Sequence, residues 1–434
     1  MSAAPVLLEH VGERGSHTME HYRARGGWET AKRVLTTMKP VEVLEVVKAS
    51  GLRGRGGAGF PTGQKWSFVP KDPGPKYLVC NADESEPGTF KDRALLEGDP
   101  HLLLEGCLIS AYAAGLQTCY IYIRGEFVTQ AVTLERAIQE AYAGGFFGRD
   151  ILGSGFSLDV TVHRGAGAYI CGEETGLLSS LEGGRGYPKI KPPFPAVKGL
   201  FGRPTVVNNV ETLATVPLIL AKGVAWFRGM GTEKSPGPKI FCVSGHVKRP
   251  GLYELPLGYP LMRLLYEDCG GPWRDRPIKA VIPGGSSAPV LDASELEVKL
   301  DFESLAAAGS MLGSGGVIVL DEGTCMVDAL WNVLRFYHHE SCGQCTPCRE
   351  GTGWIERILG RIEHGRGRME DLKTVEEASQ NMMGKTICVL ADAAALPALS
   401  FLKKFRAEFI RHLEEQGCPM RREGEPAGRS PQLT

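Results

Sequence analysis

The segment KYLVCNADESEPG, residues 76–88, joins a short apolar run to an acidic loop. The run from Tyr77 to Cys80 has the length and composition of a buried strand. Polar and acidic residues follow at once, so we expect this strand to run directly into a loop beginning at Asn81. The segments around this strand decide which kind of sheet it joins.

Helices and strands alternate on both sides of this segment. Before it, apolar residues recur at helical spacing in 41–47, directly after Pro40. After it, the sequence predicts a helix over 100–115, a strand over 119–124, a helix over 133–142 and a strand over 156–163. This alternation continues for about 240 residues, which predicts an α/β domain with a largely parallel sheet.

The remainder of the chain has a different pattern. Short strands in 239–245 and 279–285 are separated by Pro/Gly turns and by one helix over 260–269, which is typical of a small α+β domain. Helical spacing begins near Val327 and puts Leu330, Leu334 and Tyr337 on one face. The N-terminal segment and the α/β domain are predicted over residues 1–238, and the α+β domain over 239–326. A helical bundle is predicted over 327–416 and a disordered tail over 417–434.

Composition excludes some classes of function. The 434 residues are 43% hydrophobic and 23% charged, with a net charge of −1, which argues against a nucleic-acid-binding protein. The N-terminus lacks the basic and apolar regions of a signal peptide. Asp392 and Pro397 interrupt the longest apolar stretch, 387–402, which falls short of the roughly 20 residues that span a bilayer. We therefore expect no direct membrane insertion, and membrane association only through partners.

Three cysteines lie close together in ESCGQCTPCRE, residues 340–350. A C-x2-C-x2-C loop with one distant cysteine is typical of iron–sulfur clusters, whereas zinc more often takes two separated pairs. Downstream, Cys388 lies in a segment expected to be helical and Cys418 opens the predicted tail, which favours Cys388 as fourth ligand. Zinc, and ligation by His338 or His339, are the alternatives. The other cysteines are scattered singly among mostly apolar neighbours, as buried thiols are in a reducing compartment.

Four further motifs carry polar chemistry. GRGGAG, residues 54–59, satisfies the dinucleotide-binding pattern G-x-G-x-x-G. It follows a predicted helix, however, and Pro61 is expected to interrupt any helix after it. A flexible turn is therefore the alternative to a phosphate-binding loop.

The acidic loop, residues 81–88, suits ligands with hydroxyl groups. Glu86 would accept a hydrogen bond from a ribose 2′-OH and repel a 2′-phosphate. The alternative is that the loop is only solvated. GAGAYICGEET, residues 165–175, follows a predicted strand and opens a predicted helix over 172–181, a geometry in which the helix N-terminus can meet a bound cofactor. Asn208 and Asn209 precede a helix, either as an N-cap or as partners of a uracil-like ring edge.

Together these motifs, with KPPFP at 191–195, resemble the NADH-binding flavoprotein subunit of respiratory complex I, NADH:quinone oxidoreductase, over nearly the whole chain. The resemblance implies a Rossmann-like FMN domain, a ubiquitin-like SLBB domain and a helical bundle with a [4Fe–4S] cluster. It implies cytoplasmic location, peripheral on the inner face of the cell membrane. The implied partners are a thioredoxin-like [2Fe–2S] subunit and the large iron–sulfur subunit of the peripheral arm.

The resemblance also implies the site residues. FMN and NADH would be bound by Gly54, Arg55, Gly56, Gly57, Phe60, Lys65, Phe68, Asn81, Asp83, Glu84, Glu86, Tyr169, Gly172, Glu173, Glu174, Lys191, Phe194, Asn208, Asn209 and Thr212. The cluster would be held by Cys342, Cys345, Cys348 and Cys388.

The implied activity is electron input from NADH through FMN and the [4Fe–4S] cluster to partner subunits and quinone. No catalytic acid or base is expected, because the hydride passes directly between NADH and FMN and the protein contributes alignment. A diaphorase subunit of an NAD-linked hydrogenase or formate dehydrogenase is the alternative enzyme. An interaction protein with a structural metal site is the non-enzymatic alternative.

Overall fold

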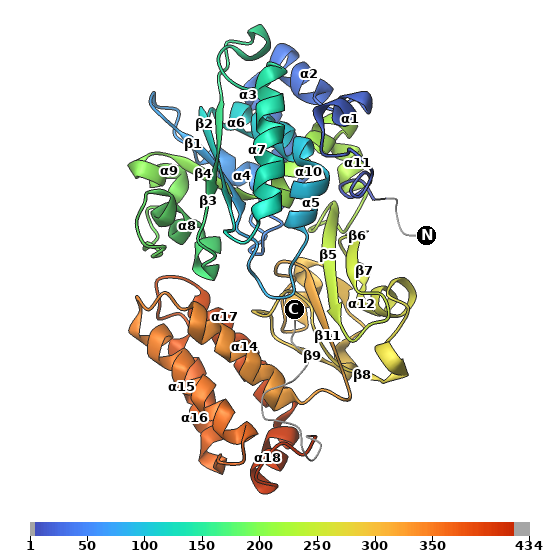
Figure 1. Cartoon of the computed structure of the whole chain (residues 1–434), viewed down its shortest axis with the longest axis vertical. Coiled ribbons are helices and arrows are strands. Elements are labelled where there is room, and N and C mark those ends of the chain that lie inside the picture. The colour runs from blue at the N-terminus through green and yellow to red at the C-terminus, as the bar shows by residue number, and fades with distance from the viewer. Residues whose placement is uncertain (1–4, 421–434) are drawn as a thin grey trace. The chain divides into compact units, whose positions relative to one another are not determined.

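The computed structural model describes residues 5–420 and forms two compact units. Of the described residues, the first unit comprises those up to Ser85, with Phe90–Phe241 and Leu252–Tyr259. The second comprises Glu86–Thr89, Cys242–Gly251 and the described residues from Pro260 onward. Figure 1 shows the elements of each unit with their labels. Within residues 5–420, no helix combines the length and apolar character needed to cross a bilayer.

A four-stranded parallel sheet organises the first unit. Its strand order is β3-β2-β1-β4, and every neighbouring pair is parallel. The strands are β1 (Tyr77–Ala82), β2 (Thr118–Ile123), β3 (Asp159–Arg164) and β4 (Thr205–Asn209). The predicted parallel sheet is therefore confirmed. β4 was not predicted from the sequence; its five residues lead directly into a helix, which leaves no separate strand signal.

Helices surround this sheet. They are α1 (Met19–Ala24), α2 (Glu29–Thr37), α3 (Pro40–Ser50), α4 (Thr62–Ser67), α5 (Asp92–Gly98), α6 (Pro100–Ala114), α7 (Val128–Ala143), α8 (Glu174–Leu181), α9 (Pro195–Lys198), α10 (Val210–Lys222) and α11 (Val224–Arg228). α6 is buried on nearly all sides, as its continuous apolar sequence requires. It approaches α10 so closely that a Cβ on Gly106 would lie 2.0 Å from the carbonyl oxygen of Leu213. Only glycine fits at that contact.

The segment after the glycine-rich loop differs from the expectation. We expected Pro61 to interrupt any helix there, yet α4 begins at Thr62 with Pro61 as its N-cap. A proline in front of a helix is tolerated because its missing N–H belongs to the first turn, which lacks intrahelical acceptors. α4 is thus continuous with the loop and carries Lys65.

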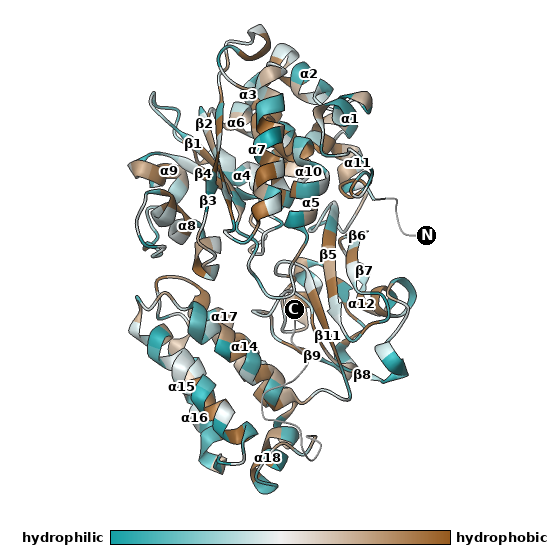
Figure 2. Ribbon diagram, viewed as in Figure 1, coloured by the Kyte–Doolittle hydropathy of each residue, from teal (hydrophilic) through white to brown (hydrophobic). Residues whose placement is uncertain are grey.

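The second sheet has the strand order β6-β5-β11-β8-β9. Its strands are β5 (Pro238–Gly245), β6 (Gly251–Pro256), β8 (Ile278–Ile282), β9 (Leu291–Asp292) and β11 (Gly316–Asp321), and β7 (Tyr259–Pro260) pairs with β10 (Lys299–Leu300). β11 is buried along its length, and Figure 2 shows β5 and β11 as largely hydrophobic. The helix predicted over 260–269 forms as α12 (Leu261–Arg263) and a wider π-helical turn (Leu264–Asp268), in which the Cys269 N–H donates to the Leu264 carbonyl. α13 (Phe302–Ala307) precedes β11.

The last described part is helical, as predicted. It consists of α14 (Met326–Glu340), α15 (Thr346–Glu363), α16 (Met369–Met382), α17 (Leu390–Lys404) and α18 (Arg406–Glu414). Leu330, Leu334 and Tyr337 are buried on one face of α14. Residues 417–420, the start of the predicted tail, are described here as a turn, whereas 421–434 lie outside the described residues.

Candidate functional site

The carboxyl ends of β1 and β4 place three asparagines next to each other. Asn81 pairs with Asn209 in the parallel register, one position after the Cys80–Asn208 pair. The Asn81 amide donates to the carbonyl of Gly172 at 2.9 Å, and the Trp66 indole donates to Asn208 Oδ1 at 2.8 Å. The strand ends, the turn before α8 and helix α4 thus meet at one edge of the sheet, where ligands of open α/β sheets bind.

Asn209 is the N-cap of α10. Its Oδ1 accepts from the Glu211 N–H at 3.0 Å, and its amide nitrogen donates to Asp92 Oδ2 at 2.6 Å. The N-cap interpretation is therefore confirmed for Asn209. Asn208 lies at the end of β4, with its side-chain oxygen held by Trp66.

The glycine-rich loop lies against the start of α10. The Arg55 N–H donates to Thr212 Oγ1 at 2.8 Å, and a Cβ on Gly56 would lie 3.0 Å from Asn209 Cβ. Gly57 has φ +146°, and no atom lies within 4 Å of the position where its Cβ would stand. The loop therefore packs against α10 through Gly56, while the space beside Gly57 is open.

Arg55 turns its guanidinium into the interior of the first unit. Nη2 donates to the Pro236 carbonyl at 2.9 Å, whereas Nε and Nη1 are buried without a hydrogen-bond partner. Burial lowers the pKa of Arg55 to about 10, although nearby Glu211 favours its charged form. Two buried donors of a cation remain available to an anionic or polar group.

Lysine and glutamate side chains surround the start of α8. Lys65 bonds Glu174 at 2.9 Å, and Lys191 contacts Glu173 at 3.1 Å and Glu174 at 3.2 Å. Glu173 also caps α8, accepting from the backbone N–H groups of Thr175 and Gly176. Burial raises the pKa of Glu174, but the two lysines outweigh burial and hold that pKa below its ordinary value. The Glu174 carboxylate is therefore charged, and the side chains of Glu173 and Glu174 are both fixed in place.

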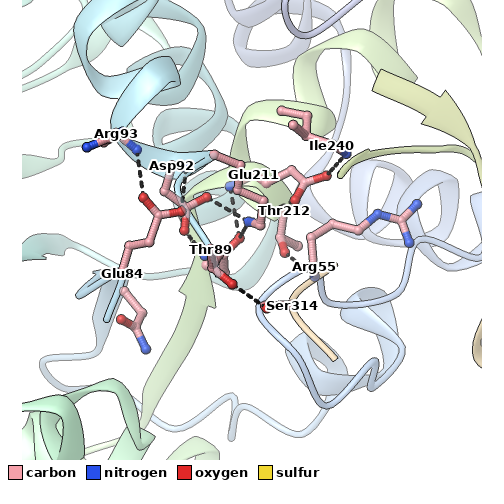
Figure 3. A network of polar contacts seen from close by, with 12 residues as sticks. Arg55, Glu84, Thr89, Asp92, Arg93, Glu211, Thr212, Ile240 and Ser314 are labelled. Carbon is pink, nitrogen blue, oxygen red and sulfur yellow. Dashed lines mark hydrogen bonds and ion pairs between the residues drawn. The ribbon is translucent and has the colours of Figure 1, made fainter. Parts of the chain in front are cut away.

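Glu84 is buried where the acidic loop meets α5. Figure 3 shows its carboxylate at the start of α5, where it accepts from the N–H groups of Asp92 at 2.7 Å and Arg93 at 3.1 Å. Burial, and then the nearby Asp92 carboxylate, raise the pKa of Glu84 to about 7. The neighbouring Asp83 is also buried, and its Oδ2 accepts from Ser85 Oγ at 3.2 Å.

A Glu84→Gln substitution is expected to flatten the dependence of folding stability on pH. The pKa of Glu84 is raised in the folded state, so the folded protein binds the extra proton and loses stability as pH rises from about 4.5 through about 7. Glutamine cannot ionise. The test is the urea concentration at the midpoint of unfolding of the flavin-free protein, measured from pH 5 to pH 8. This midpoint should fall less with rising pH for Glu84→Gln than for the wild type. An equal fall in both proteins would contradict a raised pKa of Glu84.

Aromatic rings are exposed around the loop and the KPPFP segment. Phe60, Phe68 and Phe194 have exposed fractions of 46%, 49% and 58%. The centroids of Phe60 and Phe68 lie 6.2 Å apart at a tilt of 49°. Tyr169 begins the 3-10 turn Tyr169–Gly172 in front of α8. Exposed rings of this size suit stacking on a planar ligand.

Glu86 belongs to the second unit and is held by that unit's backbone. Its Oε1 accepts from the Ser287 N–H at 2.8 Å and from Ser286 Oγ at 3.4 Å. A Cβ on Gly285, whose φ is +91°, would lie 2.5 Å from Glu86 Cγ, so the glycine leaves room for this carboxylate.

The four predicted cluster cysteines lie around the connection between α14 and α15. Gly343 takes φ +77°, which turns the loop tightly between Cys342 and Cys345. Burial raises the pKa of Cys348, and the neighbouring Cys342 and Cys345 raise it further, because three thiolates repel one another. The Ile387 N–H donates to Cys345 Sγ at 3.4 Å, which places the segment of Cys388 beside the three-cysteine loop. Cys388 itself lies in the turn before α17, not in a helix as expected.

These residues fit the groups that the resemblance implies. The open space at Gly57 and the exposed rings suit a phosphorylated, planar cofactor. Four thiols, one of them already accepting a backbone N–H, suit an iron–sulfur cluster. The role of each individual residue remains a prediction.

Sequence reasoning missed a buried charge network beneath the asparagines. Glu211 follows Asn209 in the first turn of α10 and is ion-paired with Lys91 at 2.8 Å and Lys239 at 3.4 Å. Its other oxygen accepts from the Ile240 N–H at 2.8 Å (Figure 3). The only sequence signal was the N-N-V-E-T motif, which contains Glu211 but was assigned to its asparagines.

Three family models match successive parts of the chain. They are the Nuo51 FMN-binding domain over residues 47–218, the SLBB domain over 239–319 and the NADH-ubiquinone oxidoreductase-F iron-sulfur binding region over 328–412. These matches confirm the predicted fold classes and the two cofactors, FMN and a [4Fe–4S] cluster.

Similar proteins agree. An NADH-quinone oxidoreductase subunit of Rhizobium meliloti (strain 1021) is 58% identical over 416 residues, covering 96% of this chain and 99% of its own length. The corresponding NADH-quinone oxidoreductase subunit of Mycobacterium tuberculosis (strain ATCC 25618 / H37Rv) is 52% identical over 96% of this chain and 95% of its own length. Among solved structures, an NAD+-reducing [NiFe]-hydrogenase in the H2-reduced state superposes with a TM-score of 0.82 at 37% identity, covering 96% of this chain and 68% of that chain.

The NADH-quinone oxidoreductase subunits are more similar in sequence to this chain than the hydrogenase is, and the match covers more of their own length. This favours the quinone oxidoreductase over the hydrogenase diaphorase, which the sequence left as the alternative. The hydrogenase likeness shows that both kinds of enzyme share this fold. This chain therefore belongs to the family of FMN- and [4Fe–4S]-binding subunits of NADH-quinone oxidoreductase.

Proposed function

We propose that this chain is the electron-input subunit of an NADH-quinone oxidoreductase and that the sheet edge at Asn81, Asn208 and Asn209 holds FMN. When bound, FMN accepts a hydride from NADH, and the iron–sulfur cluster accepts electrons one at a time. The observation that carries the proposal is the meeting of the glycine-rich loop, the acidic loop and the start of α8 at the carboxyl ends of β1 and β4.

The protein's contribution is binding and alignment. Gly57 leaves the loop backbone open to a phosphate, while Lys65 supplies positive charge from α4. Lys191 and the carboxylates of Glu173 and Glu174 offer partners for hydroxyl and amide groups. The exposed ring of Phe194 gives the nicotinamide dinucleotide an apolar surface for stacking.

The partners and the location follow from the same proposal. Homologues at 50–58% identity are subunits of a larger oxidoreductase, so this chain works in a complex. We propose that it delivers electrons to a thioredoxin-like [2Fe–2S] subunit and to the large iron–sulfur subunit of a peripheral arm, on the cytoplasmic face of the cell membrane. Co-purification of those two subunits with the tagged chain tests this part.

The test of the activity is anaerobic mixing of the FMN-loaded chain with NADH or NADPH, followed by flavin absorbance. NADH is expected to bleach the flavin, and absence of bleaching would refute the proposed function.

A further inference from the structure

Four side chains outside the sites described above come together in the second unit. Cys325, Glu363, His412 and Cys418 each offer one ligand atom, and these atoms all lie within 4.8 Å of one another. The first three residues are buried, and Cys418 is partly exposed. Cys325 and Cys418 are free cysteines, and the fold brings them together across 92 intervening residues.

The distances within this cluster match those of a tetrahedral metal site. Cys325 Sγ lies 3.2 Å from His412 Nε2 and 3.6 Å from Glu363 Oε2, and His412 Nε2 lies 3.4 Å from Glu363 Oε2. A tetrahedral zinc, with Zn–S bonds of about 2.3 Å and Zn–N or Zn–O bonds of about 2.0 Å, separates its ligand atoms by about 3.3 to 3.8 Å. Three edges of the tetrahedron are thus close to their required lengths.

Outer contacts orient two of the ligands. His412 Nδ1 lies 2.7 Å from the Glu408 carbonyl, and a proton on Nδ1 leaves Nε2 with a lone pair directed at the other three groups. The Asp328 N–H donates to Cys325 Sγ at 3.3 Å, which favours a thiolate there. A ring nitrogen fixed by a backbone carbonyl is the usual outer contact of a metal-bound histidine.

We propose that Cys325, Glu363, His412 and Cys418 bind one zinc ion. Two thiolates, an imidazole and a carboxylate are ligands that Zn²⁺ accepts, and their number leaves no open position, as in structural sites. On binding, each thiol loses its proton to solvent and the divalent cation offsets most of the negative charge. A Cys325–Cys418 disulfide would use only two of the four groups and would leave Glu363 and His412 directed at it without a role.

The proposed site ties together parts of the helical region. Cys325 directly precedes α14, Glu363 is the last residue of α15, His412 lies in α18, and Cys418 follows α18. The three-cysteine loop lies at the opposite ends of α14 and α15 (Figure 1). α14 has 15 residues, so the zinc site and the iron–sulfur site are separated by about 22 Å. The two sites therefore do not compete for the same thiols.

The first test is the metal content of the full-length, FMN- and iron-loaded protein after passage over a chelating resin. About one zinc per chain is expected for the wild type. Cys325→Ser and His412→Ala should lose the zinc while keeping iron and FMN, and Cys269→Ser, a buried cysteine of the same unit, should keep all three. Zinc-free wild type, with Cys325 and Cys418 as free thiols or as a disulfide, would overturn the proposal, as would zinc retained in both ligand variants.

A second measurement does not depend on whether the variants fold. Zinc-edge X-ray absorption on the wild type should show two sulfur neighbours at about 2.3 Å and two nitrogen or oxygen neighbours at about 2.0 Å. A shell of nitrogen and oxygen alone, or of four sulfurs, would overturn the assignment. Iron in the cluster does not interfere, because the two elements absorb at different edges.

Discussion

Replacing Cys388 by alanine is expected to remove the iron–sulfur cluster and to leave the flavin bound. Cys388 lies next to Ile387, whose N–H reaches Cys345 Sγ, so it is placed to complete the ligand set of the three-cysteine loop. Without a fourth thiolate the cluster has an open iron and dissociates. The iron content should fall from about four atoms per chain towards zero. The EPR signal of the reduced iron–sulfur cluster should disappear from the NADH-treated protein. Ferricyanide reduction by NADH should persist if it draws on the flavin alone.

The companion variant distinguishes the two downstream cysteines. Cys418→Ser should retain iron and the EPR signal, because Cys418 lies with Cys325 and His412 rather than at the loop of Cys345. A cluster signal that survives in Cys388→Ala and vanishes in Cys418→Ser would reverse the ligand assignment. The comparison also checks that loss of iron is not a general response to losing a thiol in this unit.

Glu211→Gln is expected to destabilise the protein by about 3–5 kcal/mol, the usual cost of breaking a buried ion pair. Glu211, Lys91 and Lys239 are all buried, and the carboxylate is the shared partner of both ammonium groups. Burial raises the pKa of Glu211, but Lys239, then Lys91 and Arg55, outweigh it and keep the pKa below its ordinary value. In the Glu211→Gln variant, the neutral amide no longer offers a negative charge to the buried ammonium groups of Lys91 and Lys239.

Urea unfolding of the flavin-free protein measures this loss. Glu135→Gln is the matched control: it removes the same charge from an exposed position of α7 and should change stability by less than about 0.5 kcal/mol. A Glu211→Gln variant as stable as that control would show that the network contributes little net stability.

Local sequence signals were sufficient for most of the fold. The strand at Tyr77 and the helix after Pro40 could be predicted from the spacing of their apolar residues and from the residues that flank them. Both kinds of signal are local, because they involve residues only a few positions apart in the sequence. β4 escaped notice because T-V-V-N-N is short and is followed at once by the first turn of α10. Pro61 was misjudged because a proline before a helix and a proline that stops one look alike in the sequence.

The sites were predictable only where the motifs are contiguous or resemble a known family. The three-cysteine loop is recognisable from its spacing alone. By contrast, Trp66 and Asn208 are 142 residues apart, and Lys91 and Glu211 are 120 apart. Single residues at such separations leave no pattern in one sequence, since only the folded chain brings them together. The same holds for Cys325 and Cys418, which are far apart in the sequence and lie together only in the folded chain.

The contact at Gly106 couples the core to the sheet edge that is proposed to hold FMN. Gly106 lets the backbone of α6 lie against Leu213, in the first turns of α10, and that same end of α10 carries Asn209, Glu211 and Thr212. A methyl group at position 106 would push α10 away from α6 and shift the edge that is proposed to hold FMN. Tolerance to sequence change at that edge is therefore set partly by a glycine in the core contact between two helices.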